Sequence, residues 1–226
     1  YAYAIACLAE AEVALRERSV GTAAEINHVR VFIVMALRRH NDYRELAVRQ
    51  RDYLRDAIRR GDRYAAASFQ WSSNVVWLAA DDPARARAEL APDIWSAPEA
   101  GLHLQHWFRV RGLVELALYE DDAAAVARAA LDIRPFAGPA FAHVEAVRTE
   151  TLYLIARAAV VAGDAAAARK AIAPLVRVRT PYIRAFVRLV LAAIEALRDR
   201  PDRARALLRG AAADADGGEM PGIAAL

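Results

Sequence analysis

Apolar residues recur along this chain at steps of three and four, the spacing that places side chains on one face of an α-helix. The clearest stripe is expected on a helix over residues 181–198, and it consists of Ile183, Phe186, Val187, Val190, Ala193, Ile194 and Leu197. The pattern predicts a leading helix at 2–18 and a tail at 214–226. Between them it predicts five helix pairs: 22–39 with 42–60, 63–80 with 83–95, 102–119 with 122–132, 140–162 with 164–176, and 181–198 with 202–213.

Acidic residues mark the turn expected inside each pair. The last acidic residue of each turn is Asp42, Asp82, Asp122, Asp164 or Asp202, so the turns recur about every 40 residues. An Asp before a helix accepts a hydrogen bond from the free N–H groups of the first turn, and its charge suits the positive end of the helix. We therefore expect each of these Asp residues to begin a helix.

A second marker runs in phase with the turns. The pattern Ala-Arg-x-x-aliphatic begins at Ala86, Ala127, Ala168 and Ala204. The expected unit is a long helix, a tight turn and a shorter Ala-rich helix, and stacked units of this kind bury their apolar stripes against their neighbours. We predict an all-α fold, an α-solenoid of antiparallel helix pairs that forms a single domain over 1–226. Its looser links are expected at 92–101 and 134–139.

Composition supports the helical interpretation and excludes several classes of protein. Of 226 residues, 55 are Ala and 30 are Arg, both strong helix formers. Gly and Pro number ten and nine and the apolar fraction is 57%, which excludes collagen-like and disordered chains. A formal net charge of +3 is not by itself the signature of a nucleic-acid-binding protein, so we expect no nucleic-acid partner.

The chain lacks the marks of a secreted or membrane protein. Its first fifteen residues include Glu10 and Glu12 and no basic segment, unlike a signal peptide. No run of 18 uncharged apolar residues could span a bilayer. Cys7 is the single cysteine, which excludes a disulfide scaffold. We expect a cytoplasmic location and no membrane partner, and the start at Tyr1 suggests a segment of a longer protein.

Three stretches carry a resemblance to a known family: GDRYAAAS at 61–68, WLAADDPARA at 77–86 and GLHLQHW at 101–107. The chain looks like the tetratricopeptide-type superfamily, although its period is near 40 rather than 34 and the Trp-Leu-Gly-Tyr pattern is absent. The run resembles the repeat region downstream of the kinase domain in large bacterial serine/threonine protein kinases and related ATPase regulators. The similarity covers roughly 60–130 and, more loosely, the whole chain. It implies a regulatory arm attached to a catalytic domain outside this segment.

Motifs for catalysis are absent from the sequence. There is no Gly-rich phosphate loop, no Gly-Lys-Ser/Thr element, and no His-Arg-Asp or Asp-Phe-Gly triplet. Phosphoryl transfer needs a phosphate cradle, metal-holding carboxylates and a base, and this segment supplies none of them as a motif. We predict that the segment is not an enzyme and needs no cofactor.

Isolated chemical groups favour structural roles. His103 and His106 are three residues apart on an expected helix, but zinc usually takes three or four ligands and no third is placed by the sequence. We expect them to pack beside Trp107 and to bind no metal. Cys7 is interpreted as a small core residue rather than a nucleophile. The acidic pairs of the turns are interpreted as helix caps rather than paired catalytic carboxylates.

The helix expected over 42–60 is the most basic. Four arginines share one of its sides: Arg44, Arg51, Arg55 and Arg59. Such a face could bind phosphate groups or an acidic partner. Acids are interleaved, however, and helical pair spacing joins Asp52 to Arg55 and joins Asp56 to both Arg59 and Arg60. We expect a solvated face that pairs with itself.

Aromatic residues supply the candidates for partner binding. The four tryptophans lie at 71, 77, 95 and 107, and we expect Trp77 and Trp107 in the core. Trp71 precedes the polar run Ser72-Ser73-Asn74, which favours a place on a concave surface that accepts a peptide. The residues predicted for this surface are Gln70, Trp71, Asn74, His103 and Arg111.

Three functions remain open from the sequence. The favoured one is a non-catalytic protein-interaction or regulatory arm of a larger bacterial signalling protein, with a protein, a peptide or the parent catalytic domain as partner. The alternative is a small-molecule-sensing helical domain of a STAND-type ATPase or transcriptional regulator, which needs an enclosed pocket with convergent polar groups. An α-helical enzyme has the least support and would need one deep cleft with clustered ionisable groups.

Overall fold

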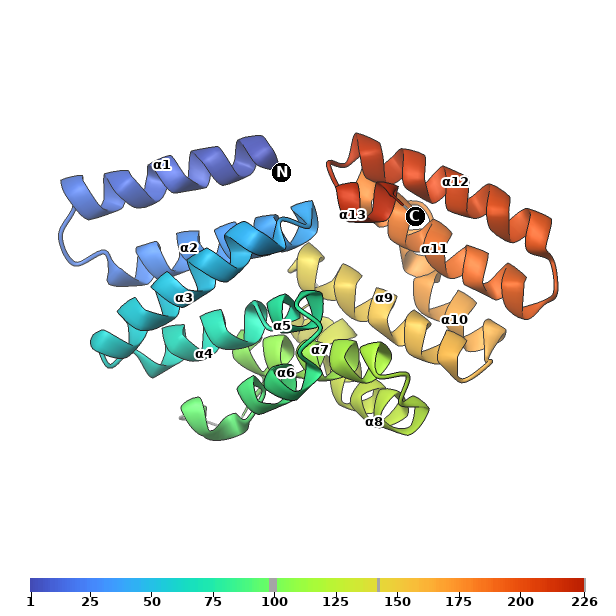
Figure 1. Cartoon of the computed structure of the whole chain (residues 1–226), viewed down its shortest axis with the longest axis horizontal. Coiled ribbons are helices and arrows are strands. Elements are labelled where there is room, and N and C mark those ends of the chain that lie inside the picture. The colour runs from blue at the N-terminus through green and yellow to red at the C-terminus, as the bar shows by residue number, and fades with distance from the viewer. Residues whose placement is uncertain (98–100, 142, 226) are drawn as a thin grey trace. The chain divides into compact units, whose positions relative to one another are not determined.

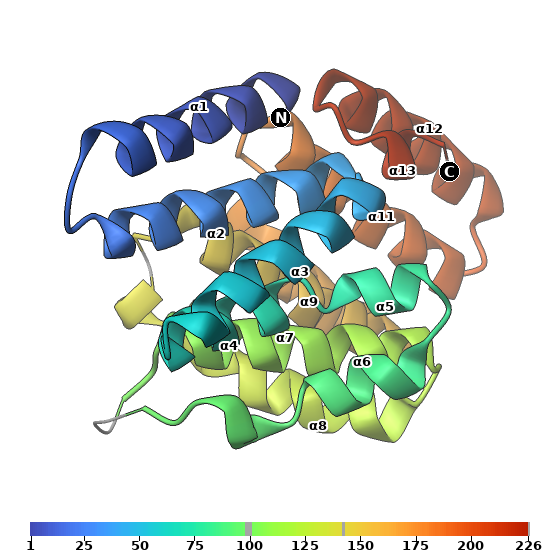
Figure 2. The same ribbon diagram turned by 60° about the vertical axis from the view of Figure 1, so that its left-hand side comes forward.

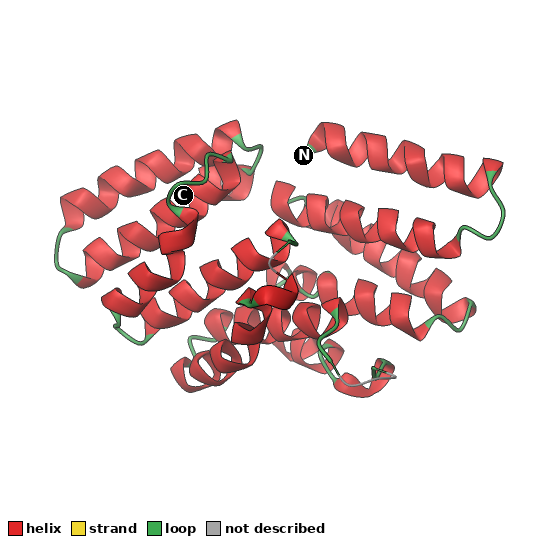
Figure 3. Ribbon diagram, turned by 180° about the vertical axis from the view of Figure 1, so that it is seen from behind, coloured by secondary structure: helices red, strands yellow, loops and turns green. Residues whose placement is uncertain are grey.

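The computed structural model describes residues 1–97, 101–141 and 143–225, and every regular element within these ranges is a helix (Figure 1, Figure 3). The prediction of an all-α fold is confirmed. Parts of three predicted segments lie outside the described residues: 98–100 of the link at 92–101, 142 of the helix at 140–162, and 226 of the tail.

The chain divides into two compact units, Tyr1–Gly112 and Leu113–Leu226. The boundary falls within α7 (Leu104–Tyr119). Unit 1 also contains α1 (Ala2–Arg18), α2 (Ala23–His40), α3 (Tyr43–Arg59), α4 (Arg63–Ser72), α5 (Val75–Ala79), α6 (Pro83–Glu89) and a 3₁₀ turn at Pro92–Ile94. α1 packs on α2, α2 on α3 and α3 on α4, and α2 also packs on α4 (Figure 2).

The core of unit 1 is built from the apolar stripes of three successive helices. Ile33 and Leu37 from α2 meet Leu46 and Tyr53 from α3 and Phe69 from α4. All five are buried. Their spacing of four or seven residues within a helix places them on one face, which explains why these segments fold as amphipathic helices.

Unit 2 repeats the same kind of packing. It contains α8 (Ala123–Ile133), α9 (Glu145–Val161), α10 (Ala165–Ile172), α11 (Pro181–Leu197), α12 (Pro201–Gly217) and α13 (Pro221–Ala224), with 3₁₀ turns at Arg134–Ala137, Pro139–Phe141 and Ala173–Leu175. Neighbouring helices from α8 to α13 pack in chain order, and α9 also packs on α11. The predicted stripe on α11 is buried at Ile183, Phe186, Val187, Val190 and Ile194.

Two stripe residues behave differently from the others. Ala193 is half-buried, and Leu197, at the last position of α11, is 46% exposed. The prediction for Leu197 is wrong, because this residue is the last of α11 and the chain turns at Arg198.

Tight turns of two or three residues join most helices in both units. One residue of each turn has a positive φ, as at Asn41 (61°), Asp81 (57°) and Asp121 (54°). The next residue donates its N–H to the carbonyl five residues back, as Asp82 does to Trp77 O at 2.8 Å. This is the Schellman motif, which satisfies carbonyls at the helix end.

The predicted Asp caps follow directly on these turns. The side chains that accept a hydrogen bond at 2.8–3.0 Å from the N–H three residues ahead are Asp42, Asp62, Asp82, Asp122 and Asp164. Four of the five predicted caps are therefore confirmed, and Asp62 adds one that was not predicted as part of the series.

The prediction for Asp202 is wrong. Asp199 takes the positive-φ position (55°), Arg200 is the N-cap without a side-chain cap bond, and Pro201 begins α12. Asp202 therefore lies inside the first turn and pairs with Arg205 at 3.0 Å.

Several helix boundaries differ from the prediction. The helix expected at 63–80 is two helices, because the backbone hydrogen bonds around Ser73 and Asn74 span three residues instead of four. The helix expected at 83–95 ends at Glu89, and Pro92 lacks the N–H that would continue it. The helix expected from 140 begins at Glu145, after the 3₁₀ turn that Pro139 starts.

The expected contrast between long and short helices holds only in the middle of the chain. α3 and α12 are each 17 residues long, similar to α2 (18 residues) and α11 (17 residues). The residues expected as a truncated tail continue α12 to Gly217 and then form the short helix α13. Whether the pairs continue as one solenoid remains a prediction.

Candidate functional site

The residues predicted for a concave binding surface are not gathered on an accessible face. Trp71, Asn74 and Arg111 are each 1% exposed, so their assignment to an open surface is wrong. Gln70 and His103 are half-buried. The polar run Ser72-Ser73-Asn74 after Trp71 suggested an exposed segment. In the structure all three residues are buried, and Asn74 hydrogen-bonds to a backbone carbonyl.

Their contacts show that these side chains join neighbouring segments of unit 1. Asn74 Nδ2 donates to Ala86 O at 2.9 Å, and Gln70 Nε2 donates to Glu89 O at 2.7 Å, so both tie the α4–α5 segment to α6. Arg111 donates to Ser72 O at 2.6 Å, and its guanidinium carbon lies 4.8 Å from the Trp107 ring centroid. These side chains hold helix ends whose carbonyls would otherwise lack partners.

Trp107 is buried, as predicted, whereas Trp77 is half-buried and carries the Arg85 guanidinium over its ring at 3.7 Å. Cys7 is exposed, and its assignment to the core is wrong because α1 packs on α2 through its opposite side. On α3, the predicted ion pairs of Asp52 with Arg55 and of Asp56 with Arg59 and Arg60 are all present, at 3.3–3.7 Å. The prediction of a self-paired face is confirmed for Arg55 and Arg59.

His103 and His106 pack together, with ring centroids 5.6 Å apart. The prediction that they pack beside Trp107 is wrong, because the ring that both contact is Trp95. His103 N–H donates to His106 Nδ1 at 3.2 Å, so this nitrogen acts as an acceptor. Burial, His103 and Arg109 lower the pKa of His106 from its usual value. Within the described residues, no three His, Cys, Asp or Glu side chains are placed to hold a metal ion.

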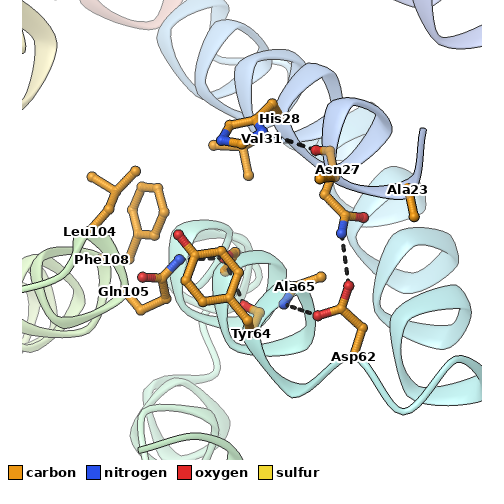
Figure 4. Close-up of a pocket in the computed structure, with 12 residues that line it drawn as sticks. Ala23, Asn27, His28, Val31, Asp62, Tyr64, Ala65, Leu104, Gln105 and Phe108 are labelled. Carbon is orange, nitrogen blue, oxygen red and sulfur yellow. Dashed lines mark hydrogen bonds between the residues drawn. The ribbon is translucent and has the colours of Figure 1, made fainter. Parts of the chain in front are cut away.

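A hollow of about 330 Å³ in unit 1 lies between α2, α4 and the first turns of α7 (Figure 4). We call it the α2–α4–α7 pocket. Its lining residues are Ala23, Ala24, Asn27, His28, Val31, Asp62, Tyr64, Ala65, Ser68, Leu104, Gln105 and Phe108. The surface they present is mostly apolar. His28 and Val31 lie on one side, with Tyr64 opposite and Leu104 and Phe108 on the third side.

Two hydrogen-bonded links fix the walls of the α2–α4–α7 pocket. Asn27 Nδ2 donates to Asp62 Oδ2 at 2.8 Å and joins α2 to the start of α4, while the other carboxylate oxygen caps α4. Gln105 Nε2 donates to Ser68 Oγ at 2.9 Å, and Ser68 Oγ donates to Tyr64 O at 2.8 Å, which joins α7 to α4. The pocket therefore has a preformed shape.

His28 and Tyr64 provide hydrogen-bonding groups for a ligand in the pocket. His28 Nδ1 lies 2.9 Å from Ala24 O, and a carbonyl can only accept, so Nδ1 carries the hydrogen and Nε2 of the neutral ring is an acceptor. Tyr64 is 47% exposed, and its ring meets Trp95 edge-on at 5.8 Å. The phenol is free to donate or accept toward a ligand.

Unit 1 also contains a buried ionic network that joins α1, α2 and α3. Arg30 Nε lies 3.0 Å from Glu12 Oε1, and Arg30 Nη1 lies 2.6 Å from Asp56 Oδ2. The Tyr53 hydroxyl donates to Glu12 Oε2 at 3.0 Å. Burial, with the charge of Glu12, raises the pKa of Tyr53 to about 12. Burial opposes ionisation of Asp56, but hydrogen bonding and charge from Arg30 outweigh it and lower the pKa of Asp56.

Comparison of the chain with protein-family models, with curated proteins and with solved structures gave no match in any of the three. The resemblance to kinase-associated repeat regions therefore remains an expectation. In the part of the chain that the structure describes, no helix has the length and hydropathy needed to cross a bilayer.

The sequence prediction missed the pocket because its walls come from segments far apart in the chain. Asn27 and Asp62 are 35 residues apart, and Ser68 and Gln105 are 37 apart. One signal was present: Gly61-Asp62 has the same turn-and-cap form as the predicted turns, and it places Asp62 at the edge of the pocket.

Proposed function

We propose that this chain is a non-catalytic regulatory binding module, and that the α2–α4–α7 pocket holds a small, mostly apolar molecule. The observation that carries the proposal is a preformed apolar hollow with two polar groups, His28 and Tyr64, at its wall. Ligand sites combine an apolar lining with a few polar groups that fix orientation.

Size supports a small ligand. The volume of about 330 Å³ lies near the lower end of the range for ligand pockets. A single aromatic ring system that buries about 150–250 Å² would gain roughly 4–6 kcal/mol before the cost of association. A hydroxyl or N–H on that ring could donate to His28 Nε2 or pair with the Tyr64 hydroxyl.

Regulation would follow from the position of the pocket. A ligand there contacts three helices that are joined to each other by the Asn27–Asp62 and Gln105–Ser68 bonds. Binding to the folded form alone stabilises it by about 2.7 kcal/mol when the ligand concentration is 100 times Kd. In a module of this kind, ligand binding makes the helices more rigid, and this change is transmitted to the protein that contains the module.

The test is a thermal-shift screen of small aromatic and aliphatic compounds against the wild-type chain and two variants. Ala24→Phe places a ring in the pocket, and Ala88→Phe places the same ring on an exposed part of α6 outside it. We expect compounds that raise the Tm of the wild type and of Ala88→Phe but not of Ala24→Phe. Absence of any saturable shift, or an equal shift in both variants, would contradict the proposal.

A protein-interaction arm of a larger signalling protein is the second candidate. It is supported by the outer side of α1, where Tyr3 is 82% exposed and Val13 is 52% exposed. Titration of the parent catalytic domain against the wild type and Tyr3→Glu distinguishes the two candidates. Binding that Tyr3→Glu weakens, and that pocket ligands leave unchanged, would favour the interaction arm.

A further inference from the structure

We propose a second binding site, in unit 2, that takes the phosphate group of a phosphate monoester. It lies where α11 meets α12 beside α10, and it is independent of the α2–α4–α7 pocket. Its parts are a buried carboxylate, four guanidinium groups and an adjacent hollow with an apolar floor.

Glu195 is the centre of the site. Its side chain is 10% exposed and each of its carboxylate oxygens faces two arginines. Oε1 lies 3.8 Å from Arg169 and 3.6 Å from Arg198. Oε2 lies 3.4 Å from Arg200 and 3.9 Å from Arg203. One carboxylate therefore gathers four cations that come from three different segments.

The charges of this cluster do not balance. One carboxylate offsets one guanidinium, and three positive charges remain. Asp199 in the adjoining turn lowers the excess to two, while Asp202 is paired with Arg205. Uncompensated like charges at short range repel, and a multivalent anion that joins them relieves that repulsion.

The four arginines are also accessible. Their side chains are between 40% and 71% exposed, whereas that of Glu195 is 10% exposed. Guanidinium groups match phosphate geometry through paired N–H donors. Because Glu195 already draws the four groups together, less side-chain entropy is lost when an anion binds.

A hollow of about 370 Å³ adjoins the cluster, and it shows which kind of anion fits. Arg169, Glu195 and Arg203 line its charged side, and Leu191, Ala206 and Leu207 line its apolar side. A bare phosphate ion would contact only the charged side. A phosphate monoester with a small carbon body would use both sides, so the arrangement favours an organic phosphate over the free ion.

Isothermal titration of the full chain with phenyl phosphate tests the site, with inorganic phosphate and benzoate as comparison ligands. We expect phenyl phosphate to bind at least about tenfold more tightly than either, because it alone combines a dianion with an apolar ring. Equal affinity for inorganic phosphate would overturn the assignment of an ester. No saturable heat for phenyl phosphate, or equal affinity for benzoate, would overturn the phosphate site itself.

A matched pair of variants locates the binding. Arg203 and Arg205 lie on the same helix with side chains 71% and 67% exposed, but only Arg203 faces Glu195. We expect Arg203→Gln to weaken phenyl phosphate binding about tenfold and Arg205→Gln to weaken it less than threefold. Equal weakening in both variants would show a diffuse charge effect, and no weakening in Arg203→Gln would place binding elsewhere. Either result contradicts the proposed site.

Discussion

Replacement of Arg30 by Met should strongly destabilise unit 1. The Arg30 side chain is 3% exposed, and it pairs with Glu12, which is 7% exposed, and with Asp56, which is 21% exposed. Met fills a similar length without a charge. The variant therefore leaves Glu12 as a buried carboxylate without its main cation, and the cost of that uncompensated charge dominates the change in stability.

The magnitude follows from the partners that remain. Removal of one member of a buried ion pair costs about 3–5 kcal/mol. Glu12 keeps the Tyr53 hydroxyl at 3.0 Å and Arg16 at 3.5 Å, and Asp56 keeps its two exposed arginines on α3. We therefore expect the lower end, about 3 kcal/mol. With an m-value of about 2 kcal/mol/M, the urea midpoint falls by about 1.5 M.

Urea unfolding followed by tryptophan fluorescence is the assay, because all four tryptophans lie in unit 1. Arg59→Met is the matched control: Arg59 pairs with the same Asp56 but is 71% exposed, so its loss should cost at most about 0.5 kcal/mol. The double variant Glu12→Gln/Arg30→Met should recover at least about 1 kcal/mol. A loss below about 1 kcal/mol in Arg30→Met, or an equal loss in Arg59→Met, would refute the reasoning.

Three further predictions concern turns and pH. Asp164→Ala should lower the free energy of unfolding by about 1 kcal/mol because it removes a helix cap, whereas Asp202→Ala should lower it by at most about 0.5 kcal/mol. Urea unfolding followed by circular dichroism measures both, and equal losses would contradict the cap assignment. Asp121→Gly should stabilise by up to about 1 kcal/mol in the same assay, since φ is 54° there; a loss would count against strain at this turn. The pKa of His106 is lowered in the folded chain, so below about pH 6.5 the unfolded chain binds more protons than the folded chain. The urea midpoint of unfolding, followed by tryptophan fluorescence, should therefore fall as the pH drops from about 7.5 to about 5.5. His106→Gln should flatten this dependence, and an unchanged slope would contradict the assignment.

Local chemistry could be predicted from the sequence where cause and effect lie within a few residues. An Asp that begins a helix needs only the N–H three residues ahead, so Asp42, Asp82, Asp122 and Asp164 were identified correctly. The ion pairs of α3 likewise depend on helical spacing alone. The prediction failed at Asp202, where Pro201 and the turn at Asp199 shift the helix start by two residues.

The burial of a side chain could not be predicted from the residues that neighbour it in the sequence. Asn74 and Arg111 have polar side chains, and each is buried because a backbone carbonyl on another segment accepts its hydrogen bond. Cys7 lies in an apolar run and is exposed, because α1 packs through its other side. Which partner a polar side chain reaches is a property of tertiary packing, and it decides where an accessible site forms.

The candidate sites depend on the same tertiary information. The α2–α4–α7 pocket takes residues from three helices, and the Glu195 cluster takes arginines from three segments. In the sequence, the arginines after Glu195 look like the many others in an Arg-rich chain. Their convergence on one carboxylate appears only when α10, α11 and α12 are packed.

The most direct test of the proposed function is an amide-shift titration of the ¹⁵N-labelled chain with a small aromatic donor such as indole. If the α2–α4–α7 pocket holds such a ligand, saturable shifts appear at the pocket residues of α2, α4 and α7, among them Asn27, Tyr64 and Gln105, and Ala24→Phe abolishes them while Ala88→Phe does not. Shifts that never saturate, that lie outside these residues, or that persist in Ala24→Phe would contradict a ligand-binding role for this pocket.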